Sequence, residues 1–420
     1  MVRHEFPWFW DHLKALDDPR DDPRYSVAQV LCLVMLMFAC RIPSRRQLDL
    51  KTDDARFRDN WCVFSRATSE TVICSKQMIN VLARLDREEV SALRPGFLKT
   101  LIRQKQVPDL YLLGHVMMAG DGTGIFASSA YHCPQCLTQN HQDGSTTYLH
   151  NVLEIKAVGW NGLAISVLTE PELNADDGTY DKQDCETKAF RRALPRLRQT
   201  FPREPIVHLL DSLFCQGPIF RDITECRQQF ICCFKRGSIP TLYDEALELR
   251  SLAPHNRLTR MFRLEGHHIR QVYTWVNSLD YQGLTLDFVM CEETVDGKTT
   301  TFAFLTTLAV TQHNVEIIAK GGRLRWKIEN EGFNEQKTGY ELEHFCDCNN
   351  LDVMLNLYYL LQIAHLFMQL LIRSDLIEGV THLTFLADLL LEALRNLTIP
   401  EDLFDPNAAR GQIRFAKAPT

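Results

Sequence analysis

The chain has 420 residues and a formal net charge of −7, with 45 % apolar and 24 % charged residues. This balance is typical of a globular protein with a sizeable core, and it excludes a disordered or fibrous chain. A chain of this length is expected to hold two or three structural units. Because the net charge is negative, we expect any DNA contact to be regional.

Residues 1–108 are predicted to form a helical N-terminal domain that binds DNA ends or dimerises. Apolar residues recur there at the i, i+3, i+4 spacing, as in "NVLARLDREEVSALRPGFLKTLIRQ". The first residues lack the apolar core of a secretory signal, so we expect a cytoplasmic protein with reduced cysteines. The apolar run from Ser26 is short for a membrane span, and the run from Leu351 carries recurring polar residues. We therefore predict two core helices and no membrane partner.

Residues 109–235 show the pattern of three strands followed by helix, strand, helix and strand, which indicates a mixed sheet with crossover helices. Residues 236–317 are turn-rich and indicate a β-rich insertion with a hairpin at Asp296–Gly297. Helical sequence returns over residues 318–385, and residues 386–420 are assigned to a C-terminal tail. The predicted fold class is α/β, interrupted by the insertion.

Two aspartates follow apolar, strand-like runs. Asp121 lies in "MAGDGTGIF" and Asp211 in "IVHLLDSLF", each at the predicted end of a strand. Carboxylates at the carboxyl ends of adjacent strands of an α/β sheet point into a shared crevice. Each aspartate alone also fits a turn or a helix cap. Together they suggest a pair of metal ligands.

A third candidate acid, Glu329, lies in "RLRWKIENEGFNEQK", among cations and beside an exposed-looking tryptophan. An i+4 spacing predicts one helical stripe that meets the sheet; its members are Arg325, Glu329, Phe333 and Lys337. Oxygen ligands from three elements suit Mg²⁺, and two such ions roughly 4 Å apart support phosphoryl transfer. The alternative is a surface helix with a salt bridge from Arg325 to Glu329.

The cations of this segment are predicted to hold DNA phosphates. They are Arg323, Arg325, Lys327 and Lys337. Trp275, in the insertion, is a candidate by position for stacking on a flipped base, a contact that contributes roughly 1–3 kcal/mol. A tryptophan in a strand is more often a core or cross-strand residue, and we favour that interpretation.

Two further groups carry acids or metal-binding side chains. In "KQDCE", Asp184 and Glu186 could be rival metal ligands, but we expect them to cap the following helix. "HCPQC" places Cys133 and Cys136 at the spacing of a zinc half-site, with His132, His141 and His150 nearby. Structural Zn²⁺ needs four ligands, so the default expectation is a pair of reduced cysteines.

The motifs "DGTGIF", "DSLF…GPIF" and "RWKIENEGFNEQK…GYELEH" resemble those of the DDE transposases of bacterial insertion sequences. "DPR…YS", "SRRQ" and "KQDCE" also look like this family, so the resemblance covers nearly the whole chain. It implies a ribonuclease H-like catalytic domain with a β-rich insertion before the final glutamate. One related signature, Tyr-x2-Arg-x3-Glu-x6-Lys, is met only in part, because Gly322 replaces the tyrosine and Lys337 is one residue late.

The resemblance implies that Asp121, Asp211 and Glu329 bind two Mg²⁺ (or Mn²⁺) ions and catalyse DNA strand cleavage and strand transfer. The expected partners are the ends of a mobile element, target DNA and a second copy of the chain, which would form a homodimer on DNA. Such a protein would be cytoplasmic and associated with the nucleoid when bound. Two alternatives are a catalytically idle DNA-binding relic and a hydrolytic nuclease of the same fold.

Overall fold

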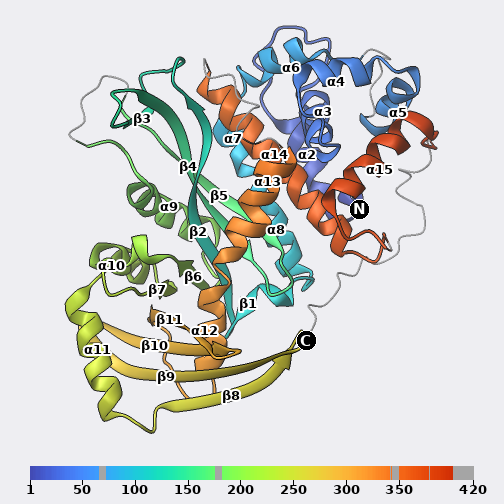
Figure 1. Ribbon diagram of the computed structural model, residues 1–420. Helices are drawn as coiled ribbons and strands as arrows, with labels where there is room; N and C mark the ends of the chain where they lie inside the picture. The colour runs from blue at the N-terminus through green and yellow to red at the C-terminus, as the bar shows by residue number, and fades with distance from the viewer. Residues whose placement is uncertain (66–71, 176–181, 341, 343–349, 378, 401–420) are drawn as a thin grey trace.

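The computed structural model describes residues 1–65, 72–175, 182–340, 342, 350–377 and 379–400. It shows a mixed α/β protein in which many helices surround one large mixed sheet (Figure 1). The final 20 residues, 401–420, which make up most of the predicted C-terminal tail, lie outside the described residues.

Several helices precede the sheet; in Figure 1 the first of them, coloured blue, gather at one side of the molecule, and the last two, coloured cyan, lie beside the sheet. They are α1 (Val2–Glu5), α2 (Pro7–Ala15), α3 (Val27–Ala39), α4 (Arg45–Thr52), α5 (Ala55–Ser65), α6 (Ser75–Leu82), α7 (Arg87–Ala92) and α8 (Arg94–Arg103). Helix α3 begins with a capping box, in which Ser26 and Gln29 each accept the other's backbone N–H. The predicted core helix is confirmed, because most of α3 is buried.

The first part of the sheet follows a 3₁₀ turn, η1 (Pro108–Leu110). Its strands are β1 (Tyr111–Leu112), β2 (His115–Ser128), β3 (Leu137–Asn140), β4 (Thr146–Val158), β5 (Ala164–Glu172), β6 (Ile206–Leu210) and β7 (Gln229–Cys233). Strand β4 pairs antiparallel with β2 on one side and with β5 on the other. On the far edge of β2, strand β6 pairs parallel with β2, and β7 pairs parallel with β6. Helices α9 (Glu186–Thr200) and α10 (Gly217–Glu225) provide the crossovers. The predicted order of long strands and helices is confirmed, and the short strands β1 and β3 are additions that were not predicted.

The two faces of this sheet are covered by different elements. Val116 and Met118 of β2 belong to a core shared with α3, α9 and α10, while Met117 and Ala119 belong to a second core on the other face. This division follows from the alternation of side chains along a strand. Asp121 follows Met117 and Ala119 at the same two-residue spacing, so its carboxylate lies on the side of the second core.

The insertion region differs in part from its prediction. It begins with an unpredicted helix, α11 (Pro240–Leu252), which has Pro240 in its first turn, a favourable start for a helix. Four antiparallel strands follow: β8 (Arg257–Leu264), β9 (His267–Tyr281), β10 (Leu284–Val295) and β11 (Lys298–Thr306). Because β11 pairs with β7, these strands extend the main sheet instead of forming a separate one (Figure 1).

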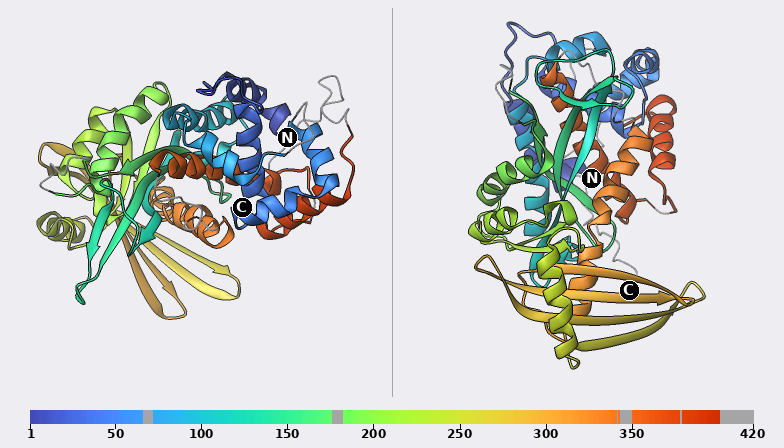
Figure 2. Two further views of the ribbon diagram at one scale, coloured as in Figure 1. Left: turned by 90° about the horizontal axis from the view of Figure 1, so that it is seen from above. Right: turned by 60° about the vertical axis from the view of Figure 1, so that its left-hand side comes forward.

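The last described third of the chain is helical. It contains α12 (Val315–Arg323), the π-helix η3 (Ile328–Asn334), α13 (Glu335–Tyr340), α14 (Leu351–Arg373) and α15 (Leu383–Asn396). Helix α15 lies across the predicted start of the tail, and Asn60 of α5 holds its end by donating its side-chain amide to the carbonyls of Leu394 and Leu397. Figure 2 shows α14 and α15 side by side with the N-terminal helices, whereas α12 lies against the strands of the insertion (Figure 1).

Helix α14 is long and apolar enough to cross a membrane by length and composition, but 83 % of its most apolar window is buried inside the protein. Helices α3, α6, α7 and α8 and strand β5 all pack against it. This burial is compatible with a soluble protein and confirms the prediction of a core helix.

Polar side chains of α14 are buried with partners. Gln362 accepts hydrogen bonds from Lys156 of β4 and Gln336 of α13, each at 2.9 Å. His365 lies 2.8 Å from Glu335, and Gln369 donates to the carbonyl of Glu331 at 2.9 Å. An unpaired buried polar group costs about 1–3 kcal/mol, so these bonds determine how η3 and α13 lie against α14.

A buried ionic network joins the N-terminal helices to the sheet. Arg94 of α8 is 1 % exposed and lies 3.8 Å from the fully buried Glu154 of β4. Thr169 and Tyr358 both donate to Glu154, and the Arg94 guanidinium stacks over the ring of Tyr359 at 4.2 Å. One network therefore connects α8, β4, β5 and α14.

Replacing Glu154 with leucine should destabilise the protein strongly, because Arg94 would stay buried without its carboxylate. We expect a loss of roughly 3–5 kcal/mol in the free energy of unfolding, measured by urea denaturation. The control is Asp59→Ala, which removes an exposed ion pair with Arg56 and should change the free energy by less than about 0.5 kcal/mol. Equal, small effects of both substitutions would show that the buried network does not stabilise the fold.

Candidate active site

Asp121 and Asp211 lie side by side at the end of the parallel pairing between β2 and β6. The last paired residues of β2 and β6 are Ala119 and Leu209. Asp121 and Asp211 each follow two residues later, so the same pairing register places the two aspartates opposite each other. The expectation that Asp121 ends its strand is wrong: β2 continues to Ser128 because β4 still pairs with it on its other edge. Strand β6 does end just before Asp211, which accepts the N–H of Leu213 and caps the short 3₁₀ helix η2 (Ser212–Phe214).

Arg325 forms an ion pair with Asp121, with 3.1 Å between Nη1 and Oδ2. Both side chains are largely buried, with 12 % and 21 % exposure. The alternative salt bridge from Arg325 to Glu329 is not among the ion pairs found in the described part of the chain. The helical segment after α12 thus contacts the sheet aspartate through its arginine, while Glu329 stays exposed.

Burial raises the pKa of Asp121 to about 6, against the opposing effect of the Arg325 charge. The negative charges of Asp211 and Glu329 add to this rise. The three predicted acids are therefore close enough to interact electrostatically. A carboxyl with so high a pKa is stabilised by any additional cation that reaches it.

A fourth acid, Glu186 at the start of α9, also belongs to this site. Its Oε1 accepts the backbone N–H of Gly122 at 3.0 Å, beyond the point where β6 ends. A Cβ on residue 122 would lie 2.9 Å from Oε2 of Glu186, so only glycine allows this approach. Burial raises the pKa of Glu186 to about 8, with further contributions from Asp121, Glu172 and Asp211.

The capping role expected for the "KQDCE" acids is wrong. Within the described residues α9 has no side-chain cap, and Asp184 instead pairs with Arg192 at 2.7 Å. The N–H of Gly122 is shared between Glu186 and Oδ1 of Asp121, which it meets at 3.1 Å, since a buried N–H requires an acceptor. Two acids after a polar loop were the available signal, but only the fold shows that Glu186 meets Asp121.

The segment around Glu329 is a π-helix, not the regular α-helix that the i+4 stripe predicted. A π-helix bonds each N–H to the carbonyl five residues earlier and occurs frequently at functional sites. Gly332 lies at its centre, packed on the buried Lys156, where an added Cβ would be 3.3 Å from Nζ. Of the predicted stripe, Phe333 is buried while Glu329 and Lys337 are exposed.

Besides Arg325, which pairs with Asp121, two more of the predicted DNA-binding cations have acidic partners. Arg323 lies 2.9 Å from Glu293 and over the ring of Phe302, and Lys327 pairs with Glu331. Ion pairs near the surface contribute only about 0–1 kcal/mol, so exchanging the acid for a phosphate costs little. These pairs do not prevent contact with DNA.

Trp275 lies on β9, is 5 % exposed and packs in the second hydrophobic core. This burial confirms the favoured interpretation of a core residue. Its ring is not available for stacking on a base in this structure. The tryptophan beside the site is Trp326, which is 58 % exposed and follows Arg325 directly. An exposed aromatic ring next to a basic and acidic cluster is the more suitable platform for a base.

Cys133 and Cys136 lie together with His150 and not with the four acids of the site, which are Asp121, Glu186, Asp211 and Glu329. Among the described residues, the two cysteines and His150 form the possible metal-binding group whose ligand atoms all lie within 4.8 Å of one another. Cys346 and Cys348, considered with them in the sequence, lie outside the described residues.

The acid site suits Mg²⁺ by the chemistry of its donors, since carboxylate oxygens are the protein ligands that Mg²⁺ prefers. Its acids do not form a group within 4.8 Å among the described residues.

Comparison with known protein families and with curated proteins finds no match for this chain. Any assignment of function therefore depends on the sequence motifs and on the geometry of the site.

Without divalent cations, the melting temperature should fall as the pH rises from about 5 to about 9. A carboxyl whose pKa is raised on folding stabilises the protein below its unfolded pKa, and this stabilisation is lost as the pH passes the folded pKa. For Glu186 the unfolded pKa is 4.5 and the folded pKa is about 8.

The variant Glu186→Gln should flatten the dependence of the melting temperature on pH, measured by thermal unfolding across this range. The control Glu245→Gln, at an exposed position, should leave this dependence unchanged. An unchanged profile in Glu186→Gln would show that this carboxyl is not responsible.

Proposed function

We propose that the chain is a DDE-type DNA transposase that binds the ends of its mobile element and catalyses Mg²⁺-dependent strand cleavage and strand transfer. The observation that carries this proposal is the register of the parallel strands β2 and β6, which brings Asp121 level with Asp211 just past the end of β6, together with the ion pair between Asp121 and Arg325 of the Glu329 segment. The three acids come from the three motifs that resemble the family.

The strand arrangement supports a ribonuclease H-like assignment for the catalytic domain. Three antiparallel strands (β5, β4 and β2) are followed by two strands parallel to β2 (β6 and β7). The β-rich segment enters after β7 and precedes the helical segment with Glu329, as the resemblance implies. The π-helix also accounts for the late Lys337, since it accommodates one extra residue.

The proposed chemistry is transfer of a phosphodiester from one hydroxyl to another. Two Mg²⁺ ions held by Asp121, Asp211 and Glu329 would activate the attacking oxygen and stabilise the leaving one. Arg325 neutralises Asp121 in the metal-free protein, and a cation at that aspartate would release the guanidinium to bind a DNA phosphate. Water as the nucleophile gives cleavage, and a 3′-hydroxyl gives joining.

Contact with DNA would extend beyond the acids. The edge strand β8 exposes three arginines, Arg257, Arg260 and Arg263, on a strand that is exposed on nearly its whole length. Phosphate binding by such cations is independent of base sequence. We propose a cytoplasmic homodimer on DNA, with element ends and target as the bound nucleic acid.

The function can be tested with labelled DNA that carries the sequences flanking the gene for this chain. Mg²⁺ should support both nicking and joined product, and Glu329→Gln should lower both by at least about 100-fold, because a metal ligand matters more than the outer partners that cost 10–100-fold. The control, Glu245→Gln, should retain both reactions.

Other outcomes select among the alternatives. Cleavage without joining would favour a hydrolytic nuclease of the same fold. Binding of the DNA ends with no cleavage by the unaltered protein would favour a catalytically idle relic. Activity that survives Glu329→Gln would remove this residue from the proposed site.

Trp326 should contribute to DNA affinity by stacking on an exposed base. Trp326→Ala is expected to weaken binding of single-stranded or nicked end DNA by roughly 5- to 150-fold, the equivalent of 1–3 kcal/mol. Trp326→Phe keeps an aromatic face and should recover most of the affinity, as measured by fluorescence anisotropy. Equal affinities of the alanine and phenylalanine variants would exclude stacking.

A further inference from the structure

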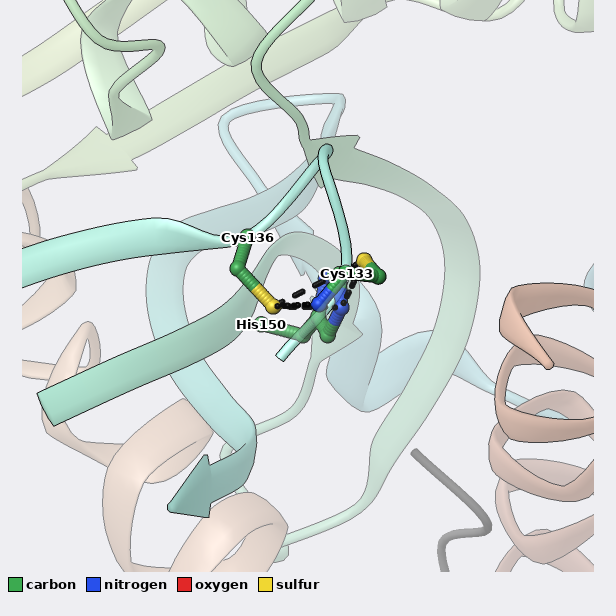
Figure 3. A group of neighbouring side chains, drawn as sticks. All are labelled: Cys133, Cys136 and His150. Atoms are coloured by element: carbon green, nitrogen blue, oxygen red, sulfur yellow. Dashed lines mark hydrogen bonds between the residues drawn. The ribbon is translucent and has the colours of Figure 1, made fainter. Parts of the chain in front are cut away.

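Cys133, Cys136 and His150 converge at the base of the β3–β4 hairpin (Figure 3). His150 Nε2 lies 3.2 Å from Sγ of Cys133 and 3.3 Å from Sγ of Cys136. The two sulfurs are 3.6 Å apart. Three soft donor atoms from two segments thus surround one point.

The sulfurs are not joined, since a disulfide bond requires about 2.05 Å between them. Two thiolates and an imidazole form a ligand set that binds Zn²⁺ in proteins, with a water completing the tetrahedron. The spacing of ligand atoms also fits, because four ligands at about 2.0–2.3 Å from zinc lie within 4.8 Å of one another.

The histidine is in the chemical state that a metal requires. His150 is 1 % exposed, and burial lowers its pKa, which favours the neutral ring that a metal ion requires. The ring of Phe126, which is paired with His150 across β2 and β4, lies 6.1 Å from the imidazole, measured between ring centroids. Cys136 is 4 % exposed, while Cys133 is partly accessible and leaves a path for the ion.

The cysteine turn is bonded to the segment that leads into Glu186. Asn174 donates its side-chain amide to the carbonyl of Cys136 at 2.8 Å and accepts the N–H of Asp184 at 3.1 Å. Gln183 exchanges two hydrogen bonds with the backbone of Thr138, at 2.6 and 3.0 Å. Movement of the turn would therefore be felt at residues 183–186.

We propose that Cys133, Cys136 and His150 bind one Zn²⁺ ion, with water as the fourth ligand, and that the ion fixes the turn against which residues 182–186 are held. Binding would release two thiol protons and leave the oxidation state of every atom unchanged. The proposal does not depend on the transposase assignment, since its ligands are separate from the four acids.

Metal content is the first test, on full-length protein purified under reducing conditions with Zn²⁺ present. Mass spectrometry of the dissolved metals should find about one zinc per chain, and Cys136→Ser and His150→Gln should each lose most of it. The matched control is Cys185→Ser, an exposed cysteine outside the group, which should keep its zinc.

Co²⁺ provides a second readout that needs no variant. Protein stripped of metal and titrated with Co²⁺ should develop the visible absorption of a tetrahedral site and the near-ultraviolet absorption of cobalt–thiolate bonds, both ending at one equivalent and both reversed by Zn²⁺. A competing chromophoric chelator then gives the Zn²⁺ affinity of the unaltered protein, so the test stands even where a variant fails to fold.

Three results would overturn the proposal. They are less than a tenth of an equivalent of zinc in reduced, zinc-supplemented protein, an octahedral cobalt spectrum without thiolate absorption, and a mass two hydrogens lower with no metal. The last result would identify Cys133 and Cys136 as a redox dithiol.

A hydrogen-exchange experiment tests whether the ion also fixes the segment that leads into Glu186. Zinc removal should increase hydrogen exchange at residues 182–186 and leave the exchange of α14 unchanged. Equal exchange with and without zinc would show that the ion orders the turn alone.

Discussion

The arrangement of this protein depends on the buried polar side chains of α14. Gln362, His365 and Gln369 are almost completely buried, and their partners lie on β4, α13 and η3. Because each bond would be costly to lose in a low-dielectric interior, α14 can lie against the sheet in only one register. That register sets the position of η3, and with it the position of Arg325 and Glu329 opposite Asp121.

The electrostatics of the acid site follow from this placement. Crowding and burial raise the pKa values of Asp121 and Glu186 to about 6 and about 8, and Arg325 opposes the rise at Asp121 alone. The metal-free site thus carries more negative charge than its one arginine balances. Such a site would stabilise divalent cations and, through them, phosphate groups, and this is the physical basis of the proposed phosphoryl transfer.

Two distant parts of the chain are connected to this site through the sheet. The insertion extends it, since β11 pairs with β7, the strand beside β6 and Asp211. The cysteine turn reaches it from the other side, through Asn174 and Gln183 to the segment that ends at Glu186. DNA bound along the insertion and zinc bound at the turn would therefore both act on the geometry of the acids through hydrogen-bonded backbone.

Local patterns in the sequence determined the order of strands and crossover helices, the two core helices, and the position of Asp211 after a strand, because periodicity and turn residues are properties of neighbouring residues. The helix α11 was missed although Pro240 marked its start. Only the tertiary structure decided which distant residues meet: Glu186 with Gly122, Arg325 with Asp121 in place of Glu329, and His150 with Cys133 and Cys136. It also decided that Trp275 is buried while Trp326 is exposed. These contacts depend on strand register and on the packing of α14, which bring together residues far apart in the chain. Local spacing did indicate the cysteine pair, but it offered three histidines, and only the fold selected His150.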